Sequence, residues 1–195
     1  YTHGNFKAGM RFESYLPRIQ GYTSTFDGSG IGMRYIRYAN DFIDVTMGSI
    51  YEQFGSGMAL RAYEDRGLGY DNMLDGIRAI VRPYKGVVLK GVYGKQRYAF
   101  LEGRIVHSDG IVRGLDGEIS LNEMFTKLAD KKLGVTIGGS FVSKFQRDDN
   151  EALILPENVG CYGARAKLRY GKFVFDAEYL VKGQDPSQDN GYNYN

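Results

Sequence analysis

Apolar and polar residues alternate along much of this chain, and this period of two limits its fold more than any other feature. In residues 6–16, Phe6, Ala8, Met10 and Phe12 share one phase, and polar residues fill the other. Successive side chains of a β-strand point to opposite faces, so such a segment has one apolar and one polar face. Residues 43–52, 133–146 and 162–181 repeat the pattern. We therefore predict an all-β fold, an antiparallel meander of about ten strands.

The clearest predicted strand pair covers residues 162–170 and 173–181. Gly171 and Lys172 separate its arms, and a two-residue connection with Gly first favours a type II′ hairpin. Each arm has about ten residues, the length that a tilted strand needs to cross a bilayer. The polar phase of the two arms carries opposite charges, which we expect to pair across the hairpin. These residues are Arg165, Lys167 and Arg169 on one arm, and Asp176 and Glu178 on the other.

Less regular segments complete the prediction. We expect strands at 31–40, 57–63, 76–82, 86–93 and 110–121, and a short helix or helical turn within 121–133. Loops rich in Gly, Asp, Asn and Ser are expected at 22–30, 146–152 and 184–195.

Two architectures share this alternation, a soluble β-sandwich and a transmembrane β-barrel. The chain has 27 Gly and 16 Tyr but only 4 Pro, and several segments exceed the usual strand length of a sandwich. A membrane barrel also carries aromatic residues where its strands meet the bilayer surface. Candidates for such a girdle are Tyr15, Tyr51, Tyr162, Tyr170 and Tyr179. The pattern favours the barrel, with a sandwich whose core holds these aromatic residues as the alternative.

Charge and residue types exclude several function classes. The formal charge is +2, which excludes a nucleic-acid binder that acts by bulk positive charge. The single Cys161 excludes an internal disulfide and a zinc site with several Cys ligands. His107, Ser108 and Asp109 are adjacent, whereas a catalytic triad assembles in space, so we expect a hairpin loop there. The acidic run 148–151 is typical of a solvated loop rather than a Ca²⁺ site. We expect no enzymatic activity, no catalytic residues, no cofactor and no metal.

Residues 48–76 carry a distinctive run. It includes Glu52-Gln53-Phe54-Gly55-Ser56-Gly57, then Leu60-Arg61, Tyr63-Glu64-Asp65-Arg66 and Leu68-Gly69-Tyr70-Asp71-Asn72. This run resembles the signature of an uncharacterised family of large outer-membrane β-barrel proteins from Bacteroidetes-type bacteria, with Ser49-Ile50 in place of the usual Asn-Phe. Residues 110–114 and 118–123 resemble the same family. The resemblance implies a bacterial outer-membrane location, contact with outer-membrane lipid, and other envelope proteins as candidate partners. It also implies that residues 1–195 form a single β-barrel domain that is incomplete at its C-terminal end, and it implies no activity.

The same run concentrates charge after a predicted bend. Gly55-Ser56-Gly57 permits a bulge or a sharp turn. Five charged residues then fall within eleven positions: Arg61, Glu64, Asp65, Arg66 and Asp71. If the segment folds into a barrel lumen, these charges need mutual pairing. The segment is then either a constriction that contacts solutes or a salt-bridged loop that stabilises the strand order.

These features lead to one leading hypothesis and two alternatives. The leading hypothesis is an outer-membrane β-barrel with porin-like passage of small polar solutes or a structural role in the envelope. The lumen would be lined by Arg11, Glu13, Arg165, Lys167, Arg169, Asp176 and Glu178 and narrowed by the 61–71 cluster, and such mixed signs predict weak ion selectivity. The first alternative is a non-conducting outer-membrane component of a larger envelope or protein-secretion assembly, with loops 17–30 and 184–195 contacting a partner. The second is a soluble β-sandwich surface-binding module.

Overall fold

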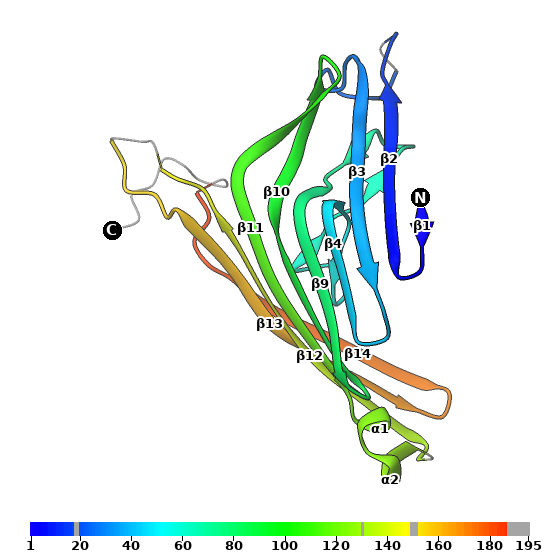
Figure 1. Cartoon of the computed structure of the whole chain (residues 1–195). Helices are drawn as coiled ribbons and strands as arrows, with labels where there is room; N and C mark the ends of the chain where they lie inside the picture. Colours follow the sequence, from blue (N-terminus) through cyan, green and yellow to red (C-terminus); the bar gives the residue numbers. More distant parts are fainter. Residues whose placement is uncertain (18–19, 130, 149–151, 187–195) are drawn as a thin grey trace.

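The computed structural model of the chain consists of one large, curved antiparallel sheet (Figure 1). It describes residues 1–17, 20–129, 131–148 and 152–186. The sheet has ten strands in the order β1-β2-β3-β4-β9-β10-β11-β12-β13-β14. Their bounds are β1 Thr2–His3, β2 Phe6–Ser14, β3 Ser29–Ala39, β4 Ile43–Ile50, β9 Leu74–Tyr84, β10 Val87–Leu101, β11 Arg104–Ser120, β12 Leu133–Phe145, β13 Asn158–Tyr170 and β14 Phe173–Lys182. The prediction of an all-β antiparallel meander is confirmed.

The sheet is open within the described residues. Among them, β14 pairs only with β13 at one edge, and the short β1 pairs only with β2 at the other. The strands therefore do not close into a barrel in this structure. Among the described residues, no helix is both long and apolar enough to cross a membrane.

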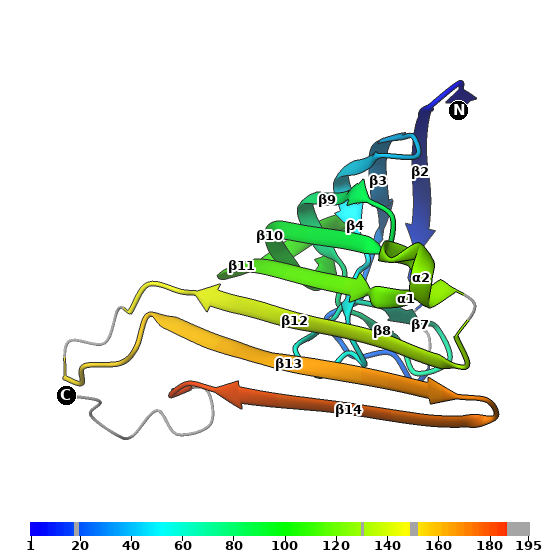
Figure 2. The ribbon, with the colours of Figure 1, turned by 90° about the horizontal axis from the view of Figure 1, so that it is seen from below.

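The alternating pattern gives the sheet two chemically different faces. The register places Phe6 opposite Tyr38 and Ala8 opposite Ile36 on one face, and Lys7 opposite Arg37 on the other. The apolar face continues through all the long strands and is largely exposed, with Met10 at 75 %, Leu115 at 66 % and Tyr179 at 73 %. Viewed from below, the sheet is curved, and residues 51–73 lie on its concave side (Figure 2). Charged side chains of the sheet pair with these residues, so the charged face is the concave one. The apolar side chains thus cover the convex face.

Residues 51–73 connect β4 to β9 in the chain, and they lie against the concave face of the sheet (Figure 2). They form two small hairpins, β5 Gln53–Phe54 with β6 Leu60–Arg61 and β7 Glu64–Asp65 with β8 Tyr70–Asp71. Phe54 and Ala62 pack into a buried cluster with sheet residues. The sheet members of this cluster are Ile50, Leu74, Val92, Val112 and Val142. We call residues 51–73 the inner segment.

The two ends of the sheet have different connections. At the lower end in Figure 1, adjacent strands join through the short turns 4–5, 40–42, 85–86 and 171–172 and through α1 Leu121–Met124 and α2 Thr126–Ala129. The predicted helical turn within 121–133 is therefore confirmed. At the other end lie the described parts of the longer connections, residues 15–17, 20–28, 146–148 and 152–157, and the extended tips of β10 and β11. We call these the short-turn end and the long-loop end.

The hairpin prediction at the C-terminal side is confirmed in register. Tyr170 pairs with Phe173, and Gly171 has φ of +59°. The first central residue of a type II′ turn requires such a positive φ, which Gly adopts without steric cost.

Three predictions of local structure are wrong. Residues 57–63 contain only the two-residue β6, because Gly55 and Gly57, with φ of +52° and +98°, turn the chain away from the sheet. His107, Ser108 and Asp109 lie within β11, because the turn comes earlier, at residues 102–103. β10 continues to Leu101, well beyond the predicted strand end at 93.

The five tyrosines predicted to form an aromatic girdle lie in two different environments. Tyr162, Tyr170 and Tyr179 are exposed. Tyr15 instead packs in a buried cluster with Phe26 and Phe100, and Tyr51 belongs to the inner segment, where its hydroxyl contacts Asp71. Residues 149–151 of the acidic run, 187–195 of the predicted terminal loop, and 18–19 of the predicted partner-binding loop lie outside the described residues.

Candidate functional site

The concave face carries a network of charged side chains whose most buried member is Arg97 of β10. The Arg97 side chain has no solvent exposure. Its Nη2 donates to Glu13 Oε2 at 2.9 Å, and its Nη1 donates to Asp71 Oδ2 at 2.7 Å. The rings of Phe26 and Phe100 lie 5.0 and 5.1 Å from its guanidinium carbon, within the range of cation–π attraction. Arg97 of β10 thus links β2 to the inner segment.

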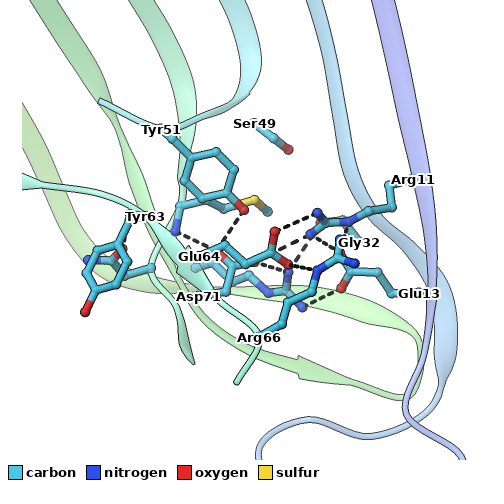
Figure 3. Close-up of polar contacts among 12 residues, drawn as sticks. Arg11, Glu13, Gly32, Ser49, Tyr51, Tyr63, Glu64, Arg66 and Asp71 are labelled. Atoms are coloured by element: carbon cyan, nitrogen blue, oxygen red, sulfur yellow. Dashed lines mark hydrogen bonds and ion pairs between the residues drawn. The ribbon is translucent and has the colours of Figure 1, made fainter. Parts of the chain in front are cut away.

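Arg11 of β2 extends this network to the second hairpin of the inner segment (Figure 3). Its Nε donates to Glu13 Oε1 at 2.8 Å, and its Nη1 donates to Glu64 Oε2 at 2.8 Å. Glu64 Oε1 also accepts a hydrogen bond from Arg66 Nε at 3.2 Å. We call Arg11, Glu13, Glu64, Asp71 and Arg97 the latch.

Asp71 is held in the latch by neutral donors as well. Its Oδ1 accepts hydrogen bonds from the Tyr51 hydroxyl at 3.1 Å and from the Met73 N–H at 3.0 Å. Burial nevertheless raises the pKa of Asp71, because desolvation of the carboxylate outweighs the attraction of Arg97. Burial, together with the nearby Asp71 carboxylate, also raises the pKa of Tyr51.

Gly32 of β3 makes room for the latch. A Cβ at this position would overlap the Glu13 carboxyl group. The Gly32 carbonyl oxygen lies 3.5 Å from Arg97 Nη1. The absence of a side chain therefore allows β3 to pass directly beside the buried ion pair.

A second group of ion pairs crosses the middle of the concave face. Asp44 of β4 accepts two hydrogen bonds from Arg37 of β3, at 2.8 and 2.7 Å, and one from Arg78 of β9 at 2.9 Å. Glu52 of the inner segment accepts one from Lys90 Nζ of β10 at 2.8 Å and lies 3.6 Å from Arg78. Positive and negative side chains therefore alternate from β3 to β10, and the inner segment supplies one of them.

A third group lies on β11 and β13. Arg165 Nη1 and Nη2 donate to the two Asp116 carboxylate oxygens at 2.7 and 3.0 Å, and Ser140 donates to Asp116 at 2.6 Å. Arg165 also lies 3.3 Å from Glu118 Oε2. Glu178 on β14 accepts a hydrogen bond from the Ser56 N–H of the inner segment at 2.9 Å. The inner segment thus contacts the sheet from β2 to β14.

The structure places the seven predicted strand residues on the concave face, with partly different partners. Lys167 lies 3.7 Å from Asp176, as predicted across the hairpin. Arg165 and Glu178 are opposite in register but bind other groups, because the inner segment and β11 offer closer partners. Arg169 faces Val174 and has no carboxylate within 4.0 Å in the part of the chain that the structure describes.

The predicted mutual pairing of the 61–71 cluster is wrong except for Glu64 with Arg66. The Arg61 guanidinium carbon lies 4.4 Å from the centre of the Tyr63 ring, and no carboxylate of the described residues lies within 4.0 Å of it. Asp65 accepts a hydrogen bond from the Leu68 N–H at 3.1 Å, which closes a local turn. Glu64 pairs with Arg11 of β2, and Asp71 pairs with Arg97 of β10, because the inner segment packs against the sheet.

Several network members escaped the sequence analysis. Arg97 lies beyond the predicted end of its strand, so no alternation signal assigned it to a face. Others occupy the polar phase of predicted strands and could have been found by extending that phase through 76–82, 86–93 and 110–121. These are Arg78, Lys90, Asp116 and Glu118.

The described residues contain no group of three or more His, Cys, Asp or Glu placed to hold a metal ion. His107 Nε2 lies 3.0 Å from Asp75 Oδ2, on the convex face near the long-loop end. Its neighbour Asp109 does not enter that contact. The chemistry of the concave face is therefore that of fixed, mostly neutralised charges.

Comparison with known proteins gives a family and no activity. Neither the curated proteins nor the solved structures contain a match to this chain. One family model matches residues 1–195, and its description is a family of unknown function. The chain belongs to this family of unknown function, DUF6029.

Proposed function

We propose that this protein is a bacterial outer-membrane β-barrel protein whose described sheet forms part of the barrel wall. The observation that carries the proposal is the polarity of the sheet, which is apolar on the convex face and charged on the concave face. A water-soluble sheet buries its apolar face against a second layer. Here the apolar face carries exposed side chains on most of the long strands, and those of Ile77, Ala79 and Val81 on β9 are half-buried; apolar side chains of a barrel face lipid in the same way.

The extent of the apolar face supports the proposal. On β14 the outward residues run from Phe173 to Val181, a rise of about 26 Å along the strand at about 3.3 Å per residue. A strand tilted by about 40° then spans roughly 20 Å, near the height of the apolar band of outer-membrane barrels. Polar side chains on the convex face gather toward the long-loop end, where Asp75 contacts both Arg34 and His107.

The connections support an orientation. Outer-membrane barrels have short turns on the periplasmic side and longer loops outside the cell. The short-turn end of this sheet would then face the periplasm. Among the described residues, β14 pairs on one side only, with β13. In a membrane its other edge would need a further paired strand, since unpaired backbone groups in hydrocarbon cost several kcal/mol each.

We further propose that small polar solutes pass through the barrel in the space that the inner segment leaves open. A second function, a non-conducting component of an envelope or secretion assembly, is favoured by one observation. The inner segment contacts both β2 and β14, and the buried ion pair between Asp71 and Arg97 holds it against the sheet. Such a segment can also block the interior completely.

Conductance across a planar bilayer separates the two functions. The full-length protein would be compared with a variant in which residues 55–70 are replaced by a short Gly-Ser linker. Passage predicts a small conductance for the unaltered protein and a larger one for the variant. Conductance of the variant alone would favour the blocked, non-conducting protein. If neither conducts while both show heat-modifiable gel mobility, solute passage is contradicted.

A further inference from the structure

A cavity of about 770 Å³ opens on the concave side at the short-turn end. It lies between the β9–β10 turn, α1 and the adjoining ends of β12 and β13. Its polar lining includes Lys85, Ser120, Asn122, Glu123, Lys167 and Arg169. A second cavity, of about 430 Å³, shares Lys85, Ser120 and Glu123 and adds Arg82 together with the carboxylates of Asp41 and Glu118. The first cavity is therefore the more cationic of the two.

The framework of the cavity is held by hydrogen bonds that do not depend on a ligand. The Asn122 side-chain amide donates to the Leu128 and Leu133 carbonyl oxygens at 2.7 and 2.8 Å, and its oxygen accepts from the Val135 N–H at 2.9 Å. The Ser120 N–H donates to the Gly86 carbonyl oxygen at 2.7 Å. These bonds fasten α1 to β12 and to the β9–β10 turn, so the walls are preformed.

Of the cations in the first cavity, Lys167 pairs with Asp176, but Lys85 and Arg169 differ from the arginines of the three ion-pair groups described above. Arg11, Arg37, Arg78, Arg97 and Arg165 each lie within 3.0 Å of at least one carboxylate oxygen. By contrast, in the described part of the chain no carboxylate lies within 4.0 Å of Arg82, Lys85 or Arg169. Uncompensated charge that is walled by protein attracts counter-ions more strongly than charge on an open surface.

We propose that this cavity binds a small solute with two or more negative charges, of the phosphate or carboxylate type. The proposal deepens the proposed function, since it treats the concave face as the interior of the barrel. The planar Arg169 guanidinium can donate two parallel hydrogen bonds to such an anion, and Lys85 can supply a second charge from the opposite wall. Glu123 opposes binding at its own side of the cavity, so the anion is expected nearer to Arg169.

Titration calorimetry with inorganic pyrophosphate tests the proposal on the full-length protein in detergent. The test variant is K85Q/R169Q. The control is K95Q/R104Q, which removes the same charge from the halves of β10 and β11 that lie toward the long-loop end. We expect saturable binding that weakens about tenfold or more in the test variant, since two charge-assisted contacts are lost. The control should bind like the unaltered protein.

A second variant guards against misfolding as an explanation. E123Q removes the opposing charge and should tighten pyrophosphate binding by about threefold, a gain that damage to the fold would not produce. Absence of saturable binding by the unaltered protein, or equal weakening in the control, would overturn the proposal. The assay needs no bilayer, so it can fail while the lipid-facing role stands.

Nanodiscs distinguish a soluble anion from a lipid headgroup. The cavity lies on the concave face, so pyrophosphate affinity should be equal in zwitterionic and anionic nanodiscs. At an ionic strength that screens the surface potential of the lipid, weaker binding in anionic nanodiscs would show competition by the lipid headgroup and would contradict a soluble ligand.

Discussion

The concave face has a covered part and a bare part, and they share one sequence pattern. From β2 to β11, the inner segment covers the charged face, and the side chains of Arg97, Asp71 and Glu13 are at most 8 % exposed. From β12 to β14, much of the face is open, and Lys167 and Asp176 are 57 and 60 % exposed. Alternation of charged and apolar residues therefore places charged side chains on the concave face. The strength of their interaction depends on whether the inner segment shields them from water.

Exposure to water determines how much each ion pair contributes to stability. An exposed ion pair contributes about 0–1 kcal/mol, because water screens the charges. A buried pair adds little net stability over apolar packing, but removal of one partner costs about 3–5 kcal/mol, since the other charge remains buried. Substitutions in the covered part should therefore destabilise the protein far more than matched substitutions in the bare part.

The largest effect is expected for Arg97→Gln. It leaves the Glu13 and Asp71 carboxylates buried without their shared cation, and the free energy of unfolding should fall by about 3–5 kcal/mol. Urea unfolding of the protein in lipid vesicles, followed by tyrosine fluorescence, measures the change. A loss below about 1 kcal/mol would show that water reaches the latch.

Phe54→Ala tests the apolar attachment of the inner segment. Phe54 is completely buried and packs against the wall cluster. Truncation of such a side chain costs about 3–4 kcal/mol, from lost burial and the cavity that remains. Proteolysis should show cleavage within 55–70 before the strands are cut. If the strands are cut at the same time as residues 55–70, the inner segment and the sheet unfold as one cooperative unit.

Asp71 should give the covered part a pH dependence. Its pKa is raised above the unfolded value, so this group favours the folded state at pH below about 4 and loses that contribution as pH rises through the raised pKa. Relative to Asp71→Asn, the unaltered protein should therefore lose stability as the pH is raised from about 4. Parallel urea titrations across pH measure this difference, and a gain in relative stability over that range would contradict the burial argument.

Glu178→Gln probes the point where the inner segment reaches the bare part. The variant keeps a hydrogen-bond acceptor for the Ser56 N–H but removes the charge, so a loss of about 1 kcal/mol or less is expected. Hydrogen exchange at Ser56 should accelerate while exchange in β10 and β11 stays unchanged. Faster exchange in β10 would mean that this contact also supports the latch.

Lys167→Gln should have the smallest effect, below about 0.5 kcal/mol, because its pair with Asp176 is exposed and 3.7 Å long. Measured by the same urea unfolding titration, Lys167→Gln is the matched control for Arg97→Gln. A loss comparable to that of Arg97→Gln would remove the distinction between the covered and bare parts.

Local alternation predicted most of the sheet, because the sequence of each strand is sufficient to identify its apolar face. Arg11, Glu13 and the charged residues of β13 and β14 were placed correctly because a phase of two extends along an uninterrupted strand. The latch could not be assembled in this way. It joins Glu13, Asp71 and Arg97 from distant parts of the chain, and the pairing depends on how the inner segment folds back.

Turn positions limited the prediction further. His107 was expected in a loop because polar residues are common in turns, yet the two-residue turn at 102–103 extends β10 and β11 past it. For Arg165, the cross-hairpin neighbour Glu178 was the natural partner from sequence. Asp116 and Glu118 compete successfully because β11 and β13 bring their side chains to the same row of the concave face.

Spin labels on neighbouring residues test the central claim, an apolar face toward lipid and a charged face toward the interior. In a Cys161→Ser background, labels would replace Leu168 and Phe175 on the convex face, and Lys167 and Asp176 on the concave face. In vesicles, the account predicts high accessibility to oxygen at 168 and 175 and high accessibility to a polar nickel complex at 167 and 176. Equal access of the nickel complex to all four positions would contradict a lipid-facing sheet.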